Sequence, residues 1–233
     1  MKVGQMFVSL LFLFLLTACQ LTSDAPENVS KEKEKDTMNQ QLIDSAQRGE
    51  TKNVLELLEN GADIDATNEQ GVTAVMAATR EHHTGTADAL IQRGADIDIR
   101  NNNQDNVLLY AGAEGFLDIV KLAVEAGTDT TLTDRYGGTA LIPAAERGHI
   151  DVVKELLTNA DTDVNHINNL HWTALLEAII LGDGGRDHQK IVQLLVDYGS
   201  DLSISDREGV TPLQHAKNNG YQEIVSILKE SGA

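Results

Sequence analysis

The sequence has a single cysteine, three prolines and few aromatic residues: one tryptophan, four tyrosines and four phenylalanines in 233 positions. One cysteine excludes a disulfide within the chain and any zinc site built from paired cysteines. Basic residues are also scarce, with 18 lysines and arginines against 36 aspartates and glutamates, a formal net charge of −18. Such an acidic surface repels phosphate groups, so we expect no nucleic-acid binding. The charge either keeps the protein soluble or steers a basic partner towards it.

Long apolar runs are absent apart from Phe7–Leu16, which follows the positive charge of Lys2. Ten residues span about 15 Å as a helix, half of a ~30 Å hydrocarbon core, so this run predicts a signal peptide rather than a membrane anchor. The letters "LTAC" that end at Cys19 resemble a bacterial lipobox. The resemblance implies removal of residues 1–18 and lipidation of Cys19. The alternative is an ordinary secretory signal in which the cysteine falls there by chance.

A lipoprotein of this kind is anchored stably, because two or more acyl chains hold a protein on a membrane where one does so only marginally. Residues 19–37 then comprise the acylated cysteine and a polar stretch that we expect to be a flexible tether. The expected location is the extracytoplasmic or periplasmic face of a bacterial cell membrane or outer membrane. Gln20, which follows the cysteine, does not decide between Gram-positive and Gram-negative hosts.

From Met38 onward the sequence repeats itself. The letters "GADID" begin at Gly61 and again at Gly94, and "GTDTT" follows at Gly127 after an equal step. A second marker keeps the same period and begins at Thr73, Asn106, Thr139, Thr173 and Thr211, with only the last step clearly longer. Two independent markers in step indicate an array of small repeated units.

These units resemble the ankyrin repeat, whose signature T-P-L-H-x-A recurs every ~33 residues, the interval that separates Gly61 from Gly94. Thr211–Leu213 keeps the proline of that signature, with Gln214 in place of the histidine, and Thr139–Leu157 is close to the pattern throughout. The resemblance implies an all-α solenoid of about six helix–turn–helix units over residues 38–233, with hairpin fingers between them. Each unit buries its apolar face only against its neighbours. The first unit, Met38–Asp63, lacks the finger, as expected of a cap.

Each repeated mark has a physical role. Threonine before the first helix accepts a hydrogen bond from a free amide, and we expect this of Thr73, Thr139, Thr173 and Thr211. Small alanines let helices approach closely, at Ala78, Ala111, Ala144, Ala178 and Ala216. Left-handed glycines end the first helix of a unit at Gly49, Gly115, Gly148, Gly182 and Gly220. Others end the second helix or turn the finger, at Gly61, Gly71, Gly94, Gly127, Gly137, Gly199 and Gly209.

No catalytic motif or nucleotide-binding loop is present, so we expect no enzyme activity, no cofactor and no bound metal. His149 and His188 stand where the resemblance implies structural histidines, and the adjacent His82 and His83 lack a third metal ligand. Alignment of the units shows an insertion at Asp183–Asp187, which accounts for the longer last step and is either a lengthened surface turn or a recognition element. An enzyme, the least favoured alternative, would use His171, His188, Asp183 and Asp187.

Trp172, the only tryptophan, precedes the helix mark of the fifth unit, where other units hold Val72, Asp105, Gly138 and Val210. The core does not require an aromatic residue there, and aromatic anchors with apolar neighbours are typical of binding hot spots. The predicted partner-binding centre comprises Tyr136, Leu170, Trp172 and Leu181, and Ile180, at the concave end of the same helix as Leu181, is a further predicted partner-binding residue. Its predicted rim comprises Asp105, Glu114, Glu146 and Arg147. The alternative is that Trp172 packs on its own finger to stiffen an irregular unit.

The sequence therefore predicts a membrane-anchored scaffold that binds a protein partner through finger tips and the concave helix face. We expect it to act as a monomer. A narrower version is an inhibitor or immunity-type protein that masks another exported protein, and a plain structural spacer is a third alternative. The identity of the partner is not encoded in any of these features.

Overall fold

The computed structural model describes residues 25–233, with side chains from residue 31, and over this range the chain is all-α. It has no strand between residues 25 and 233, as the sequence predicts. The helices are α1 (Ala25–Gln47), α2 (Thr51–Glu59), α3 (Ala74–Arg80), α4 (Thr84–Gln92), α5 (Val107–Glu114), α6 (Leu117–Glu125), α7 (Leu141–Glu146), α8 (Ile150–Asn159), α9 (Ala174–Ile180), α10 (Arg186–Asp197), α11 (Pro212–Asn218) and α12 (Gln222–Glu230).

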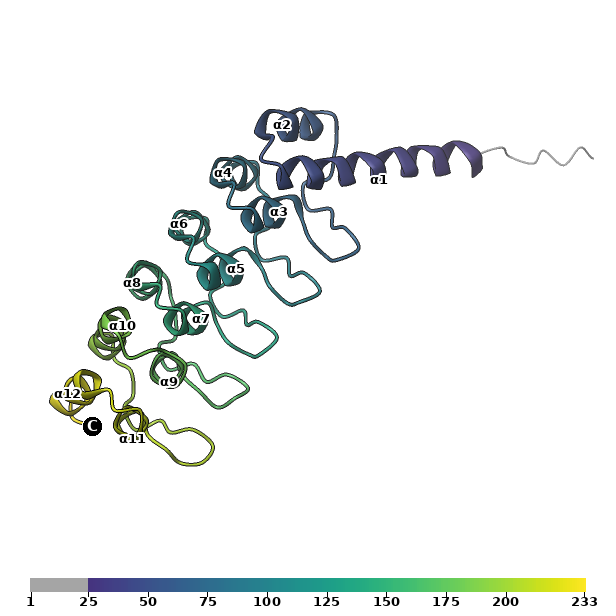
Figure 1. Ribbon diagram of the computed structural model, residues 1–233. Helices are drawn as coiled ribbons and strands as arrows, with labels where there is room; N and C mark the ends of the chain where they lie inside the picture. Colours follow the sequence, from purple (N-terminus) through teal and green to yellow (C-terminus); the bar gives the residue numbers. More distant parts are fainter. Residues whose placement is uncertain (1–24) are drawn as a thin grey trace, which may run out of the picture.

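The helices form two rows in a curved stack (Figure 1). Each odd-numbered helix packs against the next odd-numbered one, from α1 to α11, and the even-numbered helices form a second row from α2 to α12. Five loops connect an even helix to the following odd helix, and they project as fingers beside the odd row (Figure 1). The predicted solenoid of six helix pairs with hairpin fingers is therefore confirmed.

One continuous hydrophobic core runs through both rows. The five alanines expected to permit close helix approach are all fully buried: Ala78, Ala111, Ala144, Ala178 and Ala216. The even row contributes larger fully buried side chains, among them Leu90, Ile119, Leu156, Leu195 and Ile224. This core consists of the interfaces between adjacent units, because every unit buries its apolar surface against its neighbours. The stack is therefore held together unit by unit along its length.

The threonine caps form as predicted at three of four positions. Thr73, Thr173 and Thr211 each accept a hydrogen bond from the amide three residues later, at 3.3 Å. The prediction is wrong at Thr139, whose hydroxyl oxygen is buried without a partner. Pro143 explains the difference, since it has no N–H to donate to the Thr139 carbonyl. The Ile142 amide donates to the Thr139 carbonyl instead, at 3.1 Å, and is therefore not available to the Thr139 hydroxyl.

Left-handed backbone is found at the predicted glycines, with one exception. Gly182 does not adopt it, although α9 ends at Ile180, in the same register as α3 and α11 before the left-handed His82 and Gly220; the difference lies in the inserted residues that follow Gly182. Two histidines take the left-handed conformation in units that lack the expected glycine: His82 in the turn after α3 and His171 in a finger. His82 is held there by stacking on Phe116, with ring centroids 3.9 Å apart.

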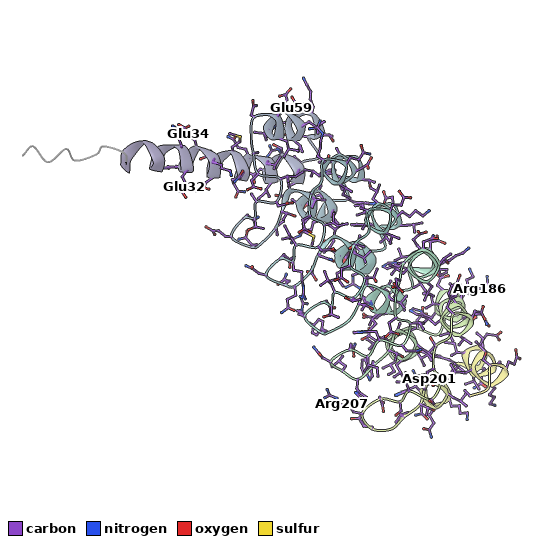
Figure 2. The ribbon with its side chains drawn as sticks, turned by 180° about the vertical axis from the view of Figure 1, so that it is seen from behind. Glu32, Glu34, Glu59, Arg186, Asp201 and Arg207 are labelled. Carbon is purple, nitrogen blue, oxygen red and sulfur yellow. The ribbon has the colours of Figure 1, made fainter. Side chains whose placement is uncertain are left out.

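Helix α1 begins at Ala25, so the prediction of a flexible chain is wrong for residues 25–37. The alternating lysines and glutamates place opposite charges three residues apart on the helix surface, and both residue types have high helix propensity. Residues 31–37 are all exposed, and this part of α1, with Glu32 and Glu34, projects beyond the stack (Figure 2). Cys19 and the predicted signal peptide lie outside the described residues. None of the helices from α1 to α12 is long and apolar enough to cross a membrane.

Candidate partner-binding site

Hydrogen bonds to one polar side chain at the base of each finger fix the finger backbone. In the fourth unit, Asp134 Oδ1 accepts hydrogen bonds from the amides of Tyr136 at 2.8 Å and Gly138 at 2.9 Å. In the fifth unit, Asn168 Oδ1 accepts hydrogen bonds from the amides of Leu170 and Trp172, both at 3.0 Å. The two fingers therefore present Tyr136 and Leu170 at equivalent, rigidly held positions.

The tips of these two fingers are also joined to each other. The Asn169 amide donates a hydrogen bond to the Tyr136 carbonyl at 2.8 Å. Gly137 makes this approach possible, since a Cβ at that position would stand 2.7 Å from Oδ1 of Asn169. Its left-handed backbone, with φ of 75°, also turns the finger. The fingers of the fourth and fifth units, before α7 and α9, consequently form one continuous edge.

A depression of about 210 Å³ lies between this edge and the odd helix row. We call it the central depression; its lining comprises Asp134, Tyr136, Gly138, Ile142, Pro143, Glu146, Asn168, Leu170, Glu177 and Leu181. Four predicted partner-binding residues meet here: Tyr136, Glu146, Leu170 and Leu181. Three of them are large apolar side chains with 53% (Tyr136), 46% (Leu170) and 51% (Leu181) of their surface exposed.

A second depression of about 300 Å³ lies one unit earlier, and Tyr136 and Glu146 line both. Arg147, also predicted as a binding residue, lines only the second. Its guanidinium donates from Nη1 to Glu114 Oε1 at 2.7 Å and to the Ala113 carbonyl at 2.8 Å. These bonds tie α7 to α5, so Arg147 links two units as well as lining the surface.

Trp172 and Ile180 line neither depression and are half-buried. Trp172 lies at the neck of its finger, where its carbonyl accepts the Asn168 amide at 3.0 Å. The equivalent Val72 is only 4% exposed, so in the second unit this position belongs to the core. Of the predicted apolar partner-binding residues, Tyr136, Leu170 and Leu181 are brought together, while Trp172 and Ile180 are not.

Glu177 is the residue of this site that the sequence analysis missed. It lies in α9, is 5% exposed, and accepts a hydrogen bond from Asn168 Nδ2 at 2.7 Å through Oε1. Burial, with a smaller effect of the negative charge of Glu146, raises the pKa of Glu177 to about 7, although the Asn168 bond opposes the shift. One feature of the sequence could have identified it: Glu177 is a carboxylate within the apolar run "ALLEAII", at a position where other units hold Ala77, Tyr110, Pro143 and His215.

The five-residue insertion packs on the next unit. Tyr221 donates from its hydroxyl to the Gly182 carbonyl at 2.9 Å, and a Cβ on Gly184 would lie 2.4 Å from the Tyr221 ring. Asp183 and His188 form a hydrogen bond at 2.7 Å, and the other ring nitrogen of His188 contacts the Glu146 carbonyl at 2.8 Å. These contacts indicate a structural turn rather than a free recognition loop, and they confirm the structural role of His188.

The residues considered for an enzyme site or a metal site do not come together in the fold. His171 and the Asp183–His188 pair lie at opposite ends of α9, so the residues of the enzyme alternative do not converge. His82 contacts Asp118 at 2.9 Å through Nε2. His149, predicted to be structural, contacts the Ala113 carbonyl at 3.1 Å. In the part of the chain that the structure describes, no group of three or more histidine, cysteine or acidic side chains could hold a metal ion.

Sequence comparison decides the family. A family model described as ankyrin repeats matches residues 42–134, 108–206 and 168–233, which together run from the last turns of α1 to residue 233. The chain belongs to the ankyrin-repeat family. It is 46% identical over 80 residues to the ankyrin repeat protein YahD of Escherichia coli strain K12. That alignment covers 34% of this chain and 40% of YahD, so the chain matches less than half of this relative's length.

Solved structures show the same fold for this ankyrin-repeat protein. An ankyrin repeat domain from Acinetobacter baumannii AYE is 47% identical, with a TM-score of 0.80 over 82% of this chain and 97% of that domain. A complex of the Bdellovibrio bacteriovorus predatory endopeptidase Bd0816 with immunity protein Bd3460 contains a chain 23% identical to this one. Its TM-score is 0.69, over 81% of this chain and 96% of that chain. At that identity the second likeness shows the fold alone.

Proposed function

We propose that this ankyrin-repeat protein is a scaffold that binds a protein partner at the central depression. Five large apolar side chains are exposed in the described part of the chain, and three of them, Tyr136, Leu170 and Leu181, line that one depression. Clustered, exposed apolar side chains on a rigid frame favour partner binding over a plain spacer. The hydrogen-bonded fingers are ordered before binding, so association costs little conformational entropy.

We further propose that the scaffold is held on a membrane, at its extracytoplasmic face, by lipid on Cys19. The exposed part of α1 ahead of Met38 supports this arrangement. Thirteen helical residues, 25–37, extend about 20 Å at 1.5 Å per residue. A helix that is polar on all sides is suited to crossing the space between a membrane and the stack, because it needs no partner for an apolar face.

Affinity capture of partners from membrane extracts of the producing cells tests both parts. Tyr136→Ala and Leu181→Ala are expected to weaken capture of the bound protein at least tenfold, since each removes an exposed anchor without touching the core. Tyr198→Ala is the matched control, because Tyr198 is 42% exposed but lies after α10, in the even row. Cys19→Ala is expected to move the protein out of the membrane fraction.

Equal capture by wild type, Tyr136→Ala and Leu181→Ala would show that the partner does not bind at the central depression. Equal loss in all three variants, Tyr198→Ala included, would show a general effect of substitution rather than a site. Retention of Cys19→Ala in the membrane fraction, with normal processing, contradicts the lipid anchor.

A narrower form of the proposal is an inhibitor or immunity-type protein that masks another exported protein. Rigid-surface recognition at one depression is compatible with that role, and so is the occurrence of this fold in a complex that contains an immunity protein. The identity of the captured protein separates the two forms: an exported enzyme that loses activity on binding supports masking.

A further inference from the structure

We propose that the central depression receives an arginine side chain of the partner, with its guanidinium at Glu146 and Glu177 and its stem against Tyr136, Leu170 and Leu181. This inference rests on the proposed function and names the chemistry of the partner. It follows from three features of the depression: its charge, the incomplete hydrogen bonding of one buried carboxyl group, and the apolar walls.

The lining carries negative charge that no lysine or arginine of the lining offsets. Asp134, Glu146 and Glu177 contribute carboxyl groups from a finger, α7 and α9. Of the basic side chains nearby, Arg147 is paired with Glu114 at 2.7 Å, and Arg135 lies over the ring of the lining residue Tyr136, with Cζ 4.7 Å from its centroid, without itself lining the depression. A cationic group of a partner would therefore complement the depression.

Glu177 shows where in the depression a cationic group would bind. It is more than nine-tenths buried, yet it lines the depression. Its Oε1 is bound by Asn168, whereas Oε2 has no hydrogen-bond donor among the side chains described from residue 31 onward and is not one of the fully buried unpartnered atoms, so it remains open to the depression. A carboxylate buried without enough donors is costly, and a guanidinium supplies five N–H donors in a planar arrangement that matches carboxylate oxygens. An apolar partner side chain would cover Oε2 and leave that cost in place.

The walls fit the rest of an arginine side chain. The aliphatic stem covers exposed apolar surface while the charged end remains with polar groups, and a guanidinium is attracted to the face of an aromatic ring. Tyr136 already has Arg135 near its ring, at 4.7 Å, so its surroundings accommodate a cation. Leu170 and Leu181, each about half exposed, supply the apolar sides.

The test is a titration of the ¹⁵N-labelled full chain in zwitterionic detergent at pH 8, followed by amide chemical shifts. The probes are N-acetylarginine N-methylamide and its neutral isostere N-acetylcitrulline N-methylamide. We expect saturable shifts at Tyr136, Leu170 and Glu177 with arginine, and at least tenfold weaker binding of citrulline. Glu177→Gln and Glu146→Gln should each weaken arginine binding at least fivefold. The control is Glu125→Gln, the same charge change on the exposed end of α6, which should leave it unchanged.

Equal binding of citrulline and arginine overturns the inference, and so does arginine binding that survives both Glu177→Gln and Glu146→Gln. The capture experiment separates this failure from failure of the proposed function. Capture that depends on Tyr136 and Leu181 but not on Glu177 and Glu146 leaves the scaffold intact and rejects arginine recognition. Loss of capture in the carboxylate variants as well as the apolar ones supports both.

Discussion

Gly182→Ala is expected to lower the free energy of unfolding by about 3 kcal/mol or more, as overpacking against backbone does. A Cβ at this position would lie 2.1 Å from the carbonyl oxygen of Ala178 and 2.5 Å from Cδ2 of His188. The first atom belongs to α9 and cannot move without breaking the end of that helix. His188 is fixed as well, by Asp183 and the Glu146 carbonyl. Urea unfolding followed by circular dichroism measures the change.

Gly85→Ala is the matched control for this substitution. Gly85 lies in α4, and a Cβ there would have no neighbour within 4 Å. Alanine is favoured over glycine inside a helix, so stability should rise by up to about 1 kcal/mol. Similar destabilisation by both substitutions, or none by either, would contradict the close contact between the inserted turn and α9.

Glu177→Gln is expected to stabilise the protein at pH 8, by about 2 kcal/mol after allowance for solvent screening, and to change little at pH 5. The wild-type carboxyl has a pKa of about 7 in the folded protein, above its ordinary value, because of burial and the charge of Glu146. Between these values the folded state binds more protons than the unfolded state, so the unfolding free energy falls as pH rises. A shift of one pKa unit corresponds to about 1.4 kcal/mol, and solvent screening reduces the sum.

Urea unfolding of wild type and Glu177→Gln at pH 5, 6, 7 and 8 checks this prediction. Glutamine keeps the oxygen that accepts from Asn168, so the comparison isolates the ionisation. Hydrogen bonds lower the pKa of Asp118 (chiefly from Thr84, then His82), of Asp183 (from the Gly185 amide and His188) and of Asp206 (from the Val210 amide and His215), and these groups titrate below the window used. A constant difference between the two proteins from pH 5 to pH 8 would show that Glu177 does not titrate there.

The fold followed from the sequence because its period repeats the same physical marks in each unit. The threonine caps and left-handed glycines depend on the backbone within a few residues, and the small alanines depend on close packing between neighbouring helices. Such features can be predicted from the residues of a single unit. The two errors in these marks have local causes: Pro143 removes a donor and redirects the first turn of α7, and the residues inserted after Gly182 replace the usual left-handed turn. The helix over residues 25–37 was missed because exposed charge was taken to indicate a flexible chain.

The site was harder to predict, since it depends on which side chains of neighbouring units face one opening. Tyr136, Leu170 and Leu181 were predicted from apolar residues at finger and helix-end positions, which the period locates. Trp172 was selected for its rarity, but its place at the neck of the finger keeps it out of the depression lining. Glu177 was overlooked because its hydrogen bond to Asn168 and the effect of the Glu146 charge on its pKa depend on contacts with the finger and with the preceding unit, which the period does not show.

The central claim is that a protein partner occupies the central depression, between the fingers of the fourth and fifth units and the odd helix row. Photo-crosslinking in the producing cells tests it most directly, with p-benzoylphenylalanine placed at position 136 or, as the control, at position 198 in the even row. The account predicts one discrete protein adduct from position 136 and none from position 198. An adduct from position 198 with none from position 136, or the same adducts from both, would contradict it.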